Sequence, residues 1–334
     1  MPLLDGRSPD AIADAARRLA DGEPVAFATE TVYGLGARAD DAAAVARVYA
    51  AKGRPADHPL IVHVADAAAA EAFADPLPPL ARRLIDALWP GPLTVIVPRR
   101  AGMAEAAAGG QGTVGLRCPA HPVAQALLRA AAARGVPGVA APSANRFGRV
   151  SPTRASHVQS EFAEVLPGLA VLDGGDCDVG IESSIVDCSR GRPVLLRPGT
   201  LSRARLEAAA GEPLHERDAA APRASGTLAA HYAPRATLRL MPAAALRTAL
   251  QVLPAEALDA AGARRLAVYS RSVAVPGALP SRRMPDDPAA AAHELFAVLR
   301  AFDDEGAQLL WVEAPPDDAA WDGVRDRLQR AAAA

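Results

Sequence analysis

Three short polar segments carry side chains that could bind a nucleotide. Each follows an apolar run or a helical pattern. They are residues 29–36 (TETVYGLG), 52–55 (KGRP) and 142–145 (PSAN). A lysine point charge and an arginine fork can neutralise phosphate groups, and glycines let a ligand approach the backbone. These segments therefore indicate an enzyme that handles a nucleotide without a Walker-type loop.

Each segment also has a purely structural interpretation. The two glycines of residues 29–36 could simply allow a tight turn after a strand, and such a pair alone is weak evidence. Lys52 and Arg54 lie just past a predicted helix, where cations offset the macrodipole for little energy. The functional interpretation depends on the three segments occurring together.

In this order, the three segments resemble the YrdC/Sua5 family, the L-threonylcarbamoyladenylate synthases of tRNA modification. The similarity runs through residue 200 and resumes at residues 231–234 (HYAP), so it covers most of the chain. The family uses a lysine, an arginine, a serine and an asparagine as one set. The resemblance implies that the catalytic set here is Lys52, Arg54, Ser143 and Asn145.

The resemblance also implies contacts to two substrates. Expected ATP contacts, besides Lys52, Arg54 and Ser143, are His58, Thr113, Ser151, Arg197 and Tyr232. Expected L-threonine contacts are Thr31, His63, Arg117, Ala141 and Ser183, the last within a family-like GIESSIVD segment.

Three of these positions have plain alternatives. His58 stands where many family members carry asparagine. A lone histidine in an apolar strand, such as His63, is usually a satisfied core residue, and Arg117 could be an exposed charge at a strand edge.

The implied reaction joins L-threonine, bicarbonate or CO2, and ATP into L-threonylcarbamoyladenylate and releases pyrophosphate. The amine would capture CO2 as a carbamate, whose oxygen attacks the α-phosphorus of ATP. Mg²⁺ would bind through the ATP phosphates, so no protein metal ligands are expected. The sequence shows no nucleophile of the Ser-His-Asp or Cys-His kind and no clear general base; His63 is the nearest candidate. The product would pass to the tRNA threonylcarbamoyl transferase machinery.

Two other functions are considered. Similar domains occur in hydrogenase-maturation carbamoyltransferases, but those proteins are far longer and carry zinc-finger cysteines that are missing here. An RNA-binding module is the second alternative. A net charge of −2 and an aromatic content of 4% argue against RNA as the main ligand. Tight nucleic-acid binding is therefore not expected.

The elements that must position these residues predict an α/β fold. Seven apolar runs read as strands, at residues 25–28, 60–64, 93–97, 113–116, 139–141, 185–186 and 194–196. Helical patterns are interleaved with them, at residues 8–20, after Asp41, and at 79–88, 121–134 and 153–163. We expect a twisted, mixed, open sheet with helices of the YrdC kind.

Three regions are expected along the chain: a catalytic domain at residues 1–211, a linker at 212–234 and an accessory Sua5-type domain at 235–334. Strand patterns at 266–269 and 309–312 predict a smaller α/β, Rossmann-like accessory domain. The linker is polar and lacks periodicity. Its end, residues 225–234, resembles the family segment that folds back across the cavity, so we expect it to act as a lid.

Composition limits the class of protein further. Hydrophobic residues make up 50% of 334 residues, but much of this is alanine, which suits strands buried under alanine-rich helices. The cysteines Cys118, Cys177 and Cys188 form no CxxC pair and fit a reducing cytoplasm. No apolar run approaches the roughly 18 residues of a membrane span. A soluble cytoplasmic protein is expected, with no membrane partner.

Overall fold

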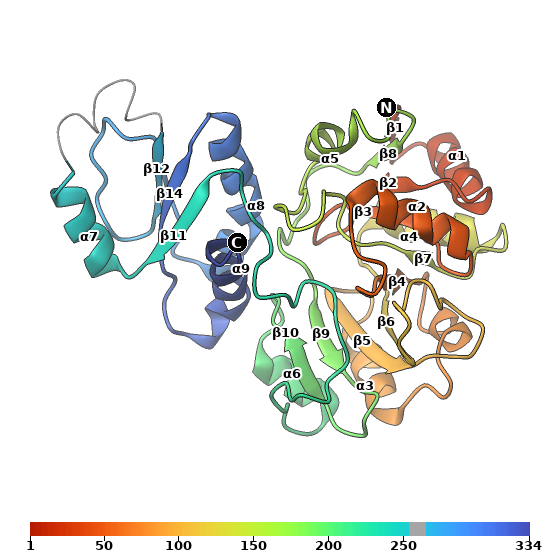
Figure 1. Cartoon of the computed structure of the whole chain (residues 1–334). Helices are drawn as coiled ribbons and strands as arrows, with labels where there is room; N and C mark the ends of the chain where they lie inside the picture. The colour runs from red at the N-terminus through yellow and green to blue at the C-terminus, as the bar shows by residue number, and fades with distance from the viewer. Residues whose placement is uncertain (254–264) are drawn as a thin grey trace. The chain divides into compact units, whose positions relative to one another are not determined.

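The chain forms two compact units, each with its own sheet (Figure 1). The computed structural model describes residues 1–253 and 265–334. The first unit comprises Met1–Phe147 and Ser151–Thr227, and the second comprises Gly148–Val150 and Leu228–Ala334.

The first unit contains a mixed ten-stranded sheet, in the order β1-β8-β2-β3-β7-β4-β6-β5-β9-β10. The sheet contains both parallel pairs, such as β4 with β6, and antiparallel pairs, such as β5 with β6. The expected mixed α/β sheet is confirmed. The strands are β1 (Leu3–Asp5), β2 (Val25–Phe27), β3 (Gly34–Arg38), β4 (Ile61–His63), β5 (Leu93–Pro98), β6 (Thr113–Arg117), β7 (Val139–Ala140), β8 (Ala170–Asp173), β9 (Ser184–Asp187) and β10 (Val194–Arg197).

Seven strands were expected in this unit, and that number is wrong because β1, β3 and β8 are additional. Strand β3 was hidden by its glycines, which break an apolar pattern. Gly36 is needed there because a Cβ atom would lie 2.6 Å from Val139 Cγ1 and 2.8 Å from Phe27 Cε1. The glycines of β3 therefore allow close packing of the strands, whether or not a ligand also approaches their backbone.

Helices cover the sheet, and those with clear capping signals begin where expected. Ser8 caps α1 and Asp41 caps α2, and each side chain accepts a hydrogen bond from a backbone amide of the first turn. Helix α1 packs against α4, and α2 against β3 (Figure 1). The helices are α1 (Pro9–Ala20), α2 (Ala42–Lys52), α3 (Pro79–Leu88), α4 (Pro122–Ala132), α5 (Ala155–Phe162) and α6 (Arg203–Ala210); α6 was not predicted.

Strand β2 shows how the core is divided between the two faces of the sheet. Val25 and Phe27 belong to one apolar cluster, whereas Ala26 and Ala28 belong to another. This is the alternation expected of a strand buried on both faces. The rigid sheet leaves the strand ends and the turns after them to carry polar side chains.

Residues 212–227, here called the strap, form part of the first unit. Its start extends the sheet edge: the Leu195 amide donates to the His215 carbonyl at 3.0 Å, and His215 donates to Pro193 at 2.8 Å. Asp218 then pairs with Arg190 and Arg192, each at 2.7 Å. The first part of the expected linker is thus bound along its length to this unit.

The described part of the second unit has a parallel sheet in the order β11-β14-β12-β13. Leu295, Val298, Leu299 and Phe302 form a buried face on its helix between Pro288 and Asp304. The smaller Rossmann-like unit is confirmed. Its elements are β11 (Thr237–Met241), α7 (Ala243–Gln251), β12 (Leu266–Ser270), β13 (Ser281–Arg283), α8 (Pro288–Asp304), β14 (Leu309–Glu313) and α9 (Asp322–Ala332).

Among the described residues, we find no helix with the length and apolar character needed to cross a membrane.

Candidate active site

Lys52 is buried at the end of α2, with 2% of its surface exposed. Gly53 ends the helix in the left-handed conformation, at φ 63°. Lys52 Nζ then donates to the carbonyl oxygens of Ser143 and Asn145, each at 2.5 Å. The structure therefore brings Lys52 together with these two predicted partners, through their backbone. A solvated cation at a helix end is excluded.

The environment of Lys52 disfavours its charged form. Burial lowers the pKa of Lys52 well below its usual range, and the positive charge of Arg54 lowers it further. An anionic ligand beside Nζ would favour the ammonium form again. A buried lysine of this kind is typical of a binding or catalytic site.

Arg54 is held in the turn that follows α2. Its Nε donates to the His58 carbonyl at 3.2 Å and its Nη2 to the Pro59 carbonyl at 2.9 Å. The guanidinium lies 5.5 Å from the centre of the Phe147 ring, and the His58 ring meets Phe147 edge-on. Burial, then Arg54, lowers the pKa of His58. The Arg54 side chain is thus fixed before any ligand binds.

Arg117 and Glu30 form a buried ion pair. Arg117 ends β6 and is 4% exposed, whereas Glu30 follows β2 and is 6% exposed. Arg117 Nη2 lies 2.8 Å from Glu30 Oε1. Arg117 is therefore no exposed edge charge. His63 pairs with Arg117 in the register of β4 and β6.

His63 is buried, and its environment makes it a weak base. Burial, then the charge of Arg117, lowers the pKa of His63 to about 3. Its ring meets Phe27 edge-on. It is therefore neutral at pH 7, and the role of general base that the sequence suggested for it is unfavourable.

Two hydroxyl groups expected to contact threonine lie in buried polar clusters. Thr31 Oγ1 is 2.9 Å from Thr29 Oγ1. Ser183 Oγ is 2.8 Å from Thr94 Oγ1 and accepts a hydrogen bond from Arg197 Nη2 at 3.2 Å. Arg197, a predicted ATP contact, thus contacts Ser183, which is predicted to bind threonine.

The remaining predicted residues of the first unit occupy turns and strand ends. Ser151 is fully buried and donates to Glu182 Oε1. Thr113 lies at the start of β6 and Ala141 directly after β7. Asn145 is buried, and its Nδ2 donates to the Arg146 carbonyl at 2.7 Å.

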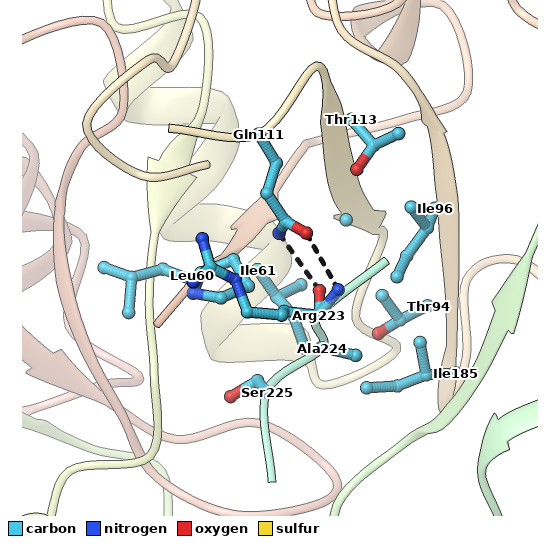
Figure 2. Close-up of a pocket in the computed structure, with 12 residues that line it drawn as sticks. Leu60, Ile61, Thr94, Ile96, Gln111, Thr113, Ile185, Arg223, Ala224 and Ser225 are labelled. Atoms are coloured by element: carbon cyan, nitrogen blue, oxygen red, sulfur yellow. Dashed lines mark hydrogen bonds between the residues drawn. The ribbon is translucent and has the colours of Figure 1, made fainter. Parts of the chain in front are cut away.

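A pocket beside this cluster is closed by the strap (Figure 2). Gln111 and the backbone of Arg223 exchange two hydrogen bonds, at 2.8 and 3.1 Å. The remaining cavity is about 10 Å³, roughly the space of one water molecule. Its lining residues are Pro59, Leu60, Ile61, Thr94, Ile96, Gln111, Thr113, Gly115, Ile185, Arg223, Ala224 and Ser225.

Ser225 of the strap contacts two of the predicted ATP residues. Its Oγ lies 3.4 Å from Arg54 Nη2, and its carbonyl accepts from Arg197 Nη1 at 3.0 Å. Strap oxygens therefore occupy positions on both guanidinium groups that a phosphate oxygen could take. Pattern analysis gave no signal for this serine.

Tyr232 belongs to the second unit. Its ring stacks on Phe296 with centroids 5.4 Å apart, and the Arg327 guanidinium lies 5.3 Å from its centre. Its φ of 63° is unusual for a residue other than glycine. The ATP contact expected of Tyr232 stays a prediction.

Glu30, Thr94 and Glu182 also belong to the polar clusters, but sequence reasoning assigned them no role. Glu30 lies in the segment 29–36 and Glu182 in the GIESSIVD segment. The available signal was therefore that both glutamates are close in sequence to predicted site residues. No group of three His, Cys, Asp or Glu side chains in the described chain is placed to hold a metal ion. Magnesium bound through ATP stays a prediction.

Two family models cover most of the chain. The Sua5/YciO/YrdC model, described as telomere recombination, matches residues 17–199. The model for the C-terminal domain of threonylcarbamoyl-AMP synthase matches residues 201–333.

Named relatives and a solved structure agree with these matches. The threonylcarbamoyl-AMP synthase of Bacillus subtilis is 45% identical over 205 residues, 61% of this chain and 57% of that protein. The Pyrococcus abyssi protein of the same name is 41% identical over 224 residues, 66% of this chain and 64% of that protein. These alignments thus span less than two thirds of either relative.

The structure of P. abyssi Sua5 complexed with L-threonine has a TM-score of 0.87 and 33% identity to this chain. The superposition covers 99% of this chain and 97% of that one. This chain belongs to the Sua5/YciO/YrdC family.

Proposed function

We propose that this chain is an L-threonylcarbamoyladenylate synthase. It would join L-threonine, bicarbonate or CO2, and ATP, with release of pyrophosphate. The observation that carries the proposal is that the first unit buries four basic side chains, namely Lys52, Arg54, Arg117 and Arg197. Buried cations are costly unless they are paired or bind an anion. A nucleotide triphosphate and an amino-acid carboxylate supply such anions, and the family relationship agrees.

The reaction needs positioning and charge stabilisation more than covalent catalysis. The neutral threonine amine forms a bond to the carbon of CO2 and releases one proton to water, giving a carbamate. One carbamate oxygen then bonds to the α-phosphorus of ATP, and the bond to the pyrophosphate oxygen breaks. Lys52 and Arg54, which are fixed before binding, would stabilise the negative charge on the phosphates. Mg²⁺ held by the phosphates would supply further positive charge.

The strap would have to move for substrates to enter. It leaves about 10 Å³ in the pocket that it covers, whereas small-molecule sites span roughly 300–1,000 Å³. Ser225 also contacts Arg54 and Arg197. We propose that the strap opens to admit substrates and closes to exclude water from a product that hydrolyses easily.

The test is pyrophosphate release by the full chain with ATP, Mg²⁺, threonine and bicarbonate, and with each component omitted in turn. The proposal expects release only when both threonine and bicarbonate are present. Release that requires carbamoyl phosphate instead would support a carbamoyltransferase. No release, together with tight RNA binding, would support an RNA-binding module. Transfer of the product to a tRNA-modifying transferase and a cytoplasmic location stay predictions.

A further inference from the structure

The Glu30–Arg117 pair is close but incompletely satisfied. The two side chains approach to 2.8 Å. Even so, no hydrogen bond joins either Glu30 carboxylate oxygen, Arg117 Nε or Arg117 Nη2 to any described group. All four atoms are buried. Buried charged groups without hydrogen bonds are expensive, so a site of this kind points to a missing ligand.

The backbone around Glu30 is held rigidly. Thr29 Oγ1 accepts hydrogen bonds from the amides of Thr31 and Val32, at 3.2 and 3.3 Å. The Glu30 carbonyl accepts from the Val179 amide at 2.7 Å. The backbone that carries the carboxylate is therefore set before binding, which lowers the entropy cost of recognising a ligand.

Glu30 reaches Arg117 from a distant part of the sheet. Strand β2 is separated from β6 by β3, β7 and β4, so the segment after β2 must cross the strand ends to bring the two groups together. The pair then lies beside Thr31, which is the next residue to Glu30, and His63, which is the register partner of Arg117. Of the residues assigned to threonine, Arg117 thus pairs with Glu30, Thr31 follows it in the chain, and His63 lies opposite Arg117 in the sheet.

The polarity of the pair matches a free amino acid. Arg117 has unpaired donors for a carboxylate, and Glu30 has unpaired acceptors for an ammonium group. A zwitterion would satisfy both groups and leave the local net charge unchanged. A plain carboxylic acid would satisfy Arg117 alone and leave Glu30 with a buried, unpaired charge.

We infer that Glu30 binds the α-ammonium group of the amino-acid substrate and so selects zwitterions over acids that lack the amine. This rests on the proposed function in that threonine is the ligand. The discrimination comes from the cost of an unpaired buried carboxylate in the wrong complex, which is a strong source of specificity.

A structural role gives a different expectation. If Glu30 only neutralises Arg117, Glu30→Gln changes the affinity for every carboxylate ligand by the same factor. If Glu30 binds the ammonium group, the loss is specific to ligands that carry one. The two roles are therefore distinguished by the affinity for an amino acid divided by the affinity for the matching acid without the amine.

The experiment is calorimetric titration of the full-length protein with two ligands. One ligand is L-threonine. The other is 2,3-dihydroxybutanoate, the acid in which a hydroxyl group replaces the α-amine of threonine. The variants are Glu30→Gln and Glu30→Asp, with Glu164→Gln as a control because Glu164 is exposed. Thermal unfolding of each variant checks its fold.

We expect Glu30→Gln to lower the preference for threonine over the hydroxy acid by about tenfold or more. Glu30→Asp should keep part of the preference, and Glu164→Gln all of it. Equal weakening of both ligands, or an unchanged preference, overturns the inference while leaving the proposed function standing. If the wild-type protein binds neither ligand, the proposed function itself is wrong, and this inference with it. Glu30→Asp decides the question if Glu30→Gln does not fold.

Discussion

The two units each bury a glutamate near the end of a strand, and the two carboxylates are treated differently. In the second unit, Glu313 at the end of β14 is 1% exposed. It accepts five hydrogen bonds, from Ser270 Oγ, Ser272 Oγ and the amides of Arg271, Ser272 and Val273. In the first unit, Glu30 has an ion pair with Arg117 but no hydrogen bond from the described residues.

This difference separates a structural charge from one placed for a ligand. The chain itself satisfies Glu313 and thereby fixes the loop after β12. Glu30 and Arg117 are left with unused bonding capacity, which a ligand can fill. Burial alone does not distinguish these roles, but the completeness of hydrogen bonding does.

The largest expected effect is on the stability of the second unit. Glu313→Ala leaves five donors without their acceptor, two of them buried and three part-buried, and should lower the free energy of unfolding by about 3 kcal/mol. Glu30→Gln should lower it by less, because it removes the ion pair with Arg117 but keeps an amide oxygen that can face the guanidinium. Denaturant unfolding gives both values, with the surface variant Glu305→Ala as a control. If Glu313→Ala and Glu30→Gln lowered the free energy of unfolding equally, the proposed difference between the two carboxylates would be wrong.

The next effect concerns the buried cations of the first unit. Lys52→Ala and Arg54→Ala should each lower adenylate formation by at least about tenfold, or roughly 1.4 kcal/mol, the scale of a desolvated phosphate contact. Steady-state rates at saturating ATP provide the measurement. Arg82→Ala is a suitable control because it changes a surface arginine paired with Glu71. Normal turnover in both site variants would show that these cations are structural.

Arg117 should distinguish the two substrates. Because its free donors face a carboxylate rather than a phosphate in our account, Arg117→Ala should weaken threonine binding far more than ATP binding. Separate calorimetric titrations with each ligand provide the comparison. Equal losses for both ligands would give Arg117 a structural role, as the partner of Glu30.

Sequence patterns predicted elements whose signals are local. Ser8 and Asp41 marked helix starts, and Arg117 and Arg197 ended predicted strands as expected. Helix α6 was missed because only Leu206 and Ala210 of its residues are buried, which is too few to make a periodic pattern. Strand β3 was missed because its glycines serve close packing.

Long-range contacts explain what the sequence did not show about the site. The strap has no hydrophobic periodicity, and it is held by polar contacts such as those of Arg223 with Gln111 and Asp57. Its composition therefore resembled that of a free linker. The partnership of Glu30 with Arg117 likewise joins distant strands, and no spacing in the sequence encodes it.

A further prediction concerns the strap. Cleavage by a protease between Ala219 and Thr227 should slow when ATP and threonine are both present, because the closed strap excludes water and protease alike. Tyr232→Ala should retain ATP less well than the wild type, if the predicted ATP contact is correct. Limited proteolysis with and without ligands tests the first point. A cleavage rate that ligands do not change would make the strap a static cover.

The smallest effect is the pH dependence of the second unit. Burial alone would raise the pKa of Glu313, but hydrogen bonds from Ser272, Ser270 and the Arg271 amide lower it overall. Its contribution to stability is therefore fully present above the ordinary carboxyl value of 4.5 and is lost as the pH falls through the lowered value. Unfolding of the wild type and of Glu313→Gln between pH 3 and 7 should show a shallower acid loss in the variant. If the stability of the wild type and of Glu313→Gln fell equally with pH, Glu313 would not be the group responsible.

The central claim is that the buried charges of the first unit are a site for threonine and ATP. Mass spectrometry of a reaction with carbon-13-labelled bicarbonate tests it most directly. The account predicts a threonylcarbamoyladenylate ion that carries the label, requires all three substrates, and is strongly reduced in Lys52→Ala. A wild-type protein that folds and binds both ligands, yet forms no labelled adenylate, would contradict it.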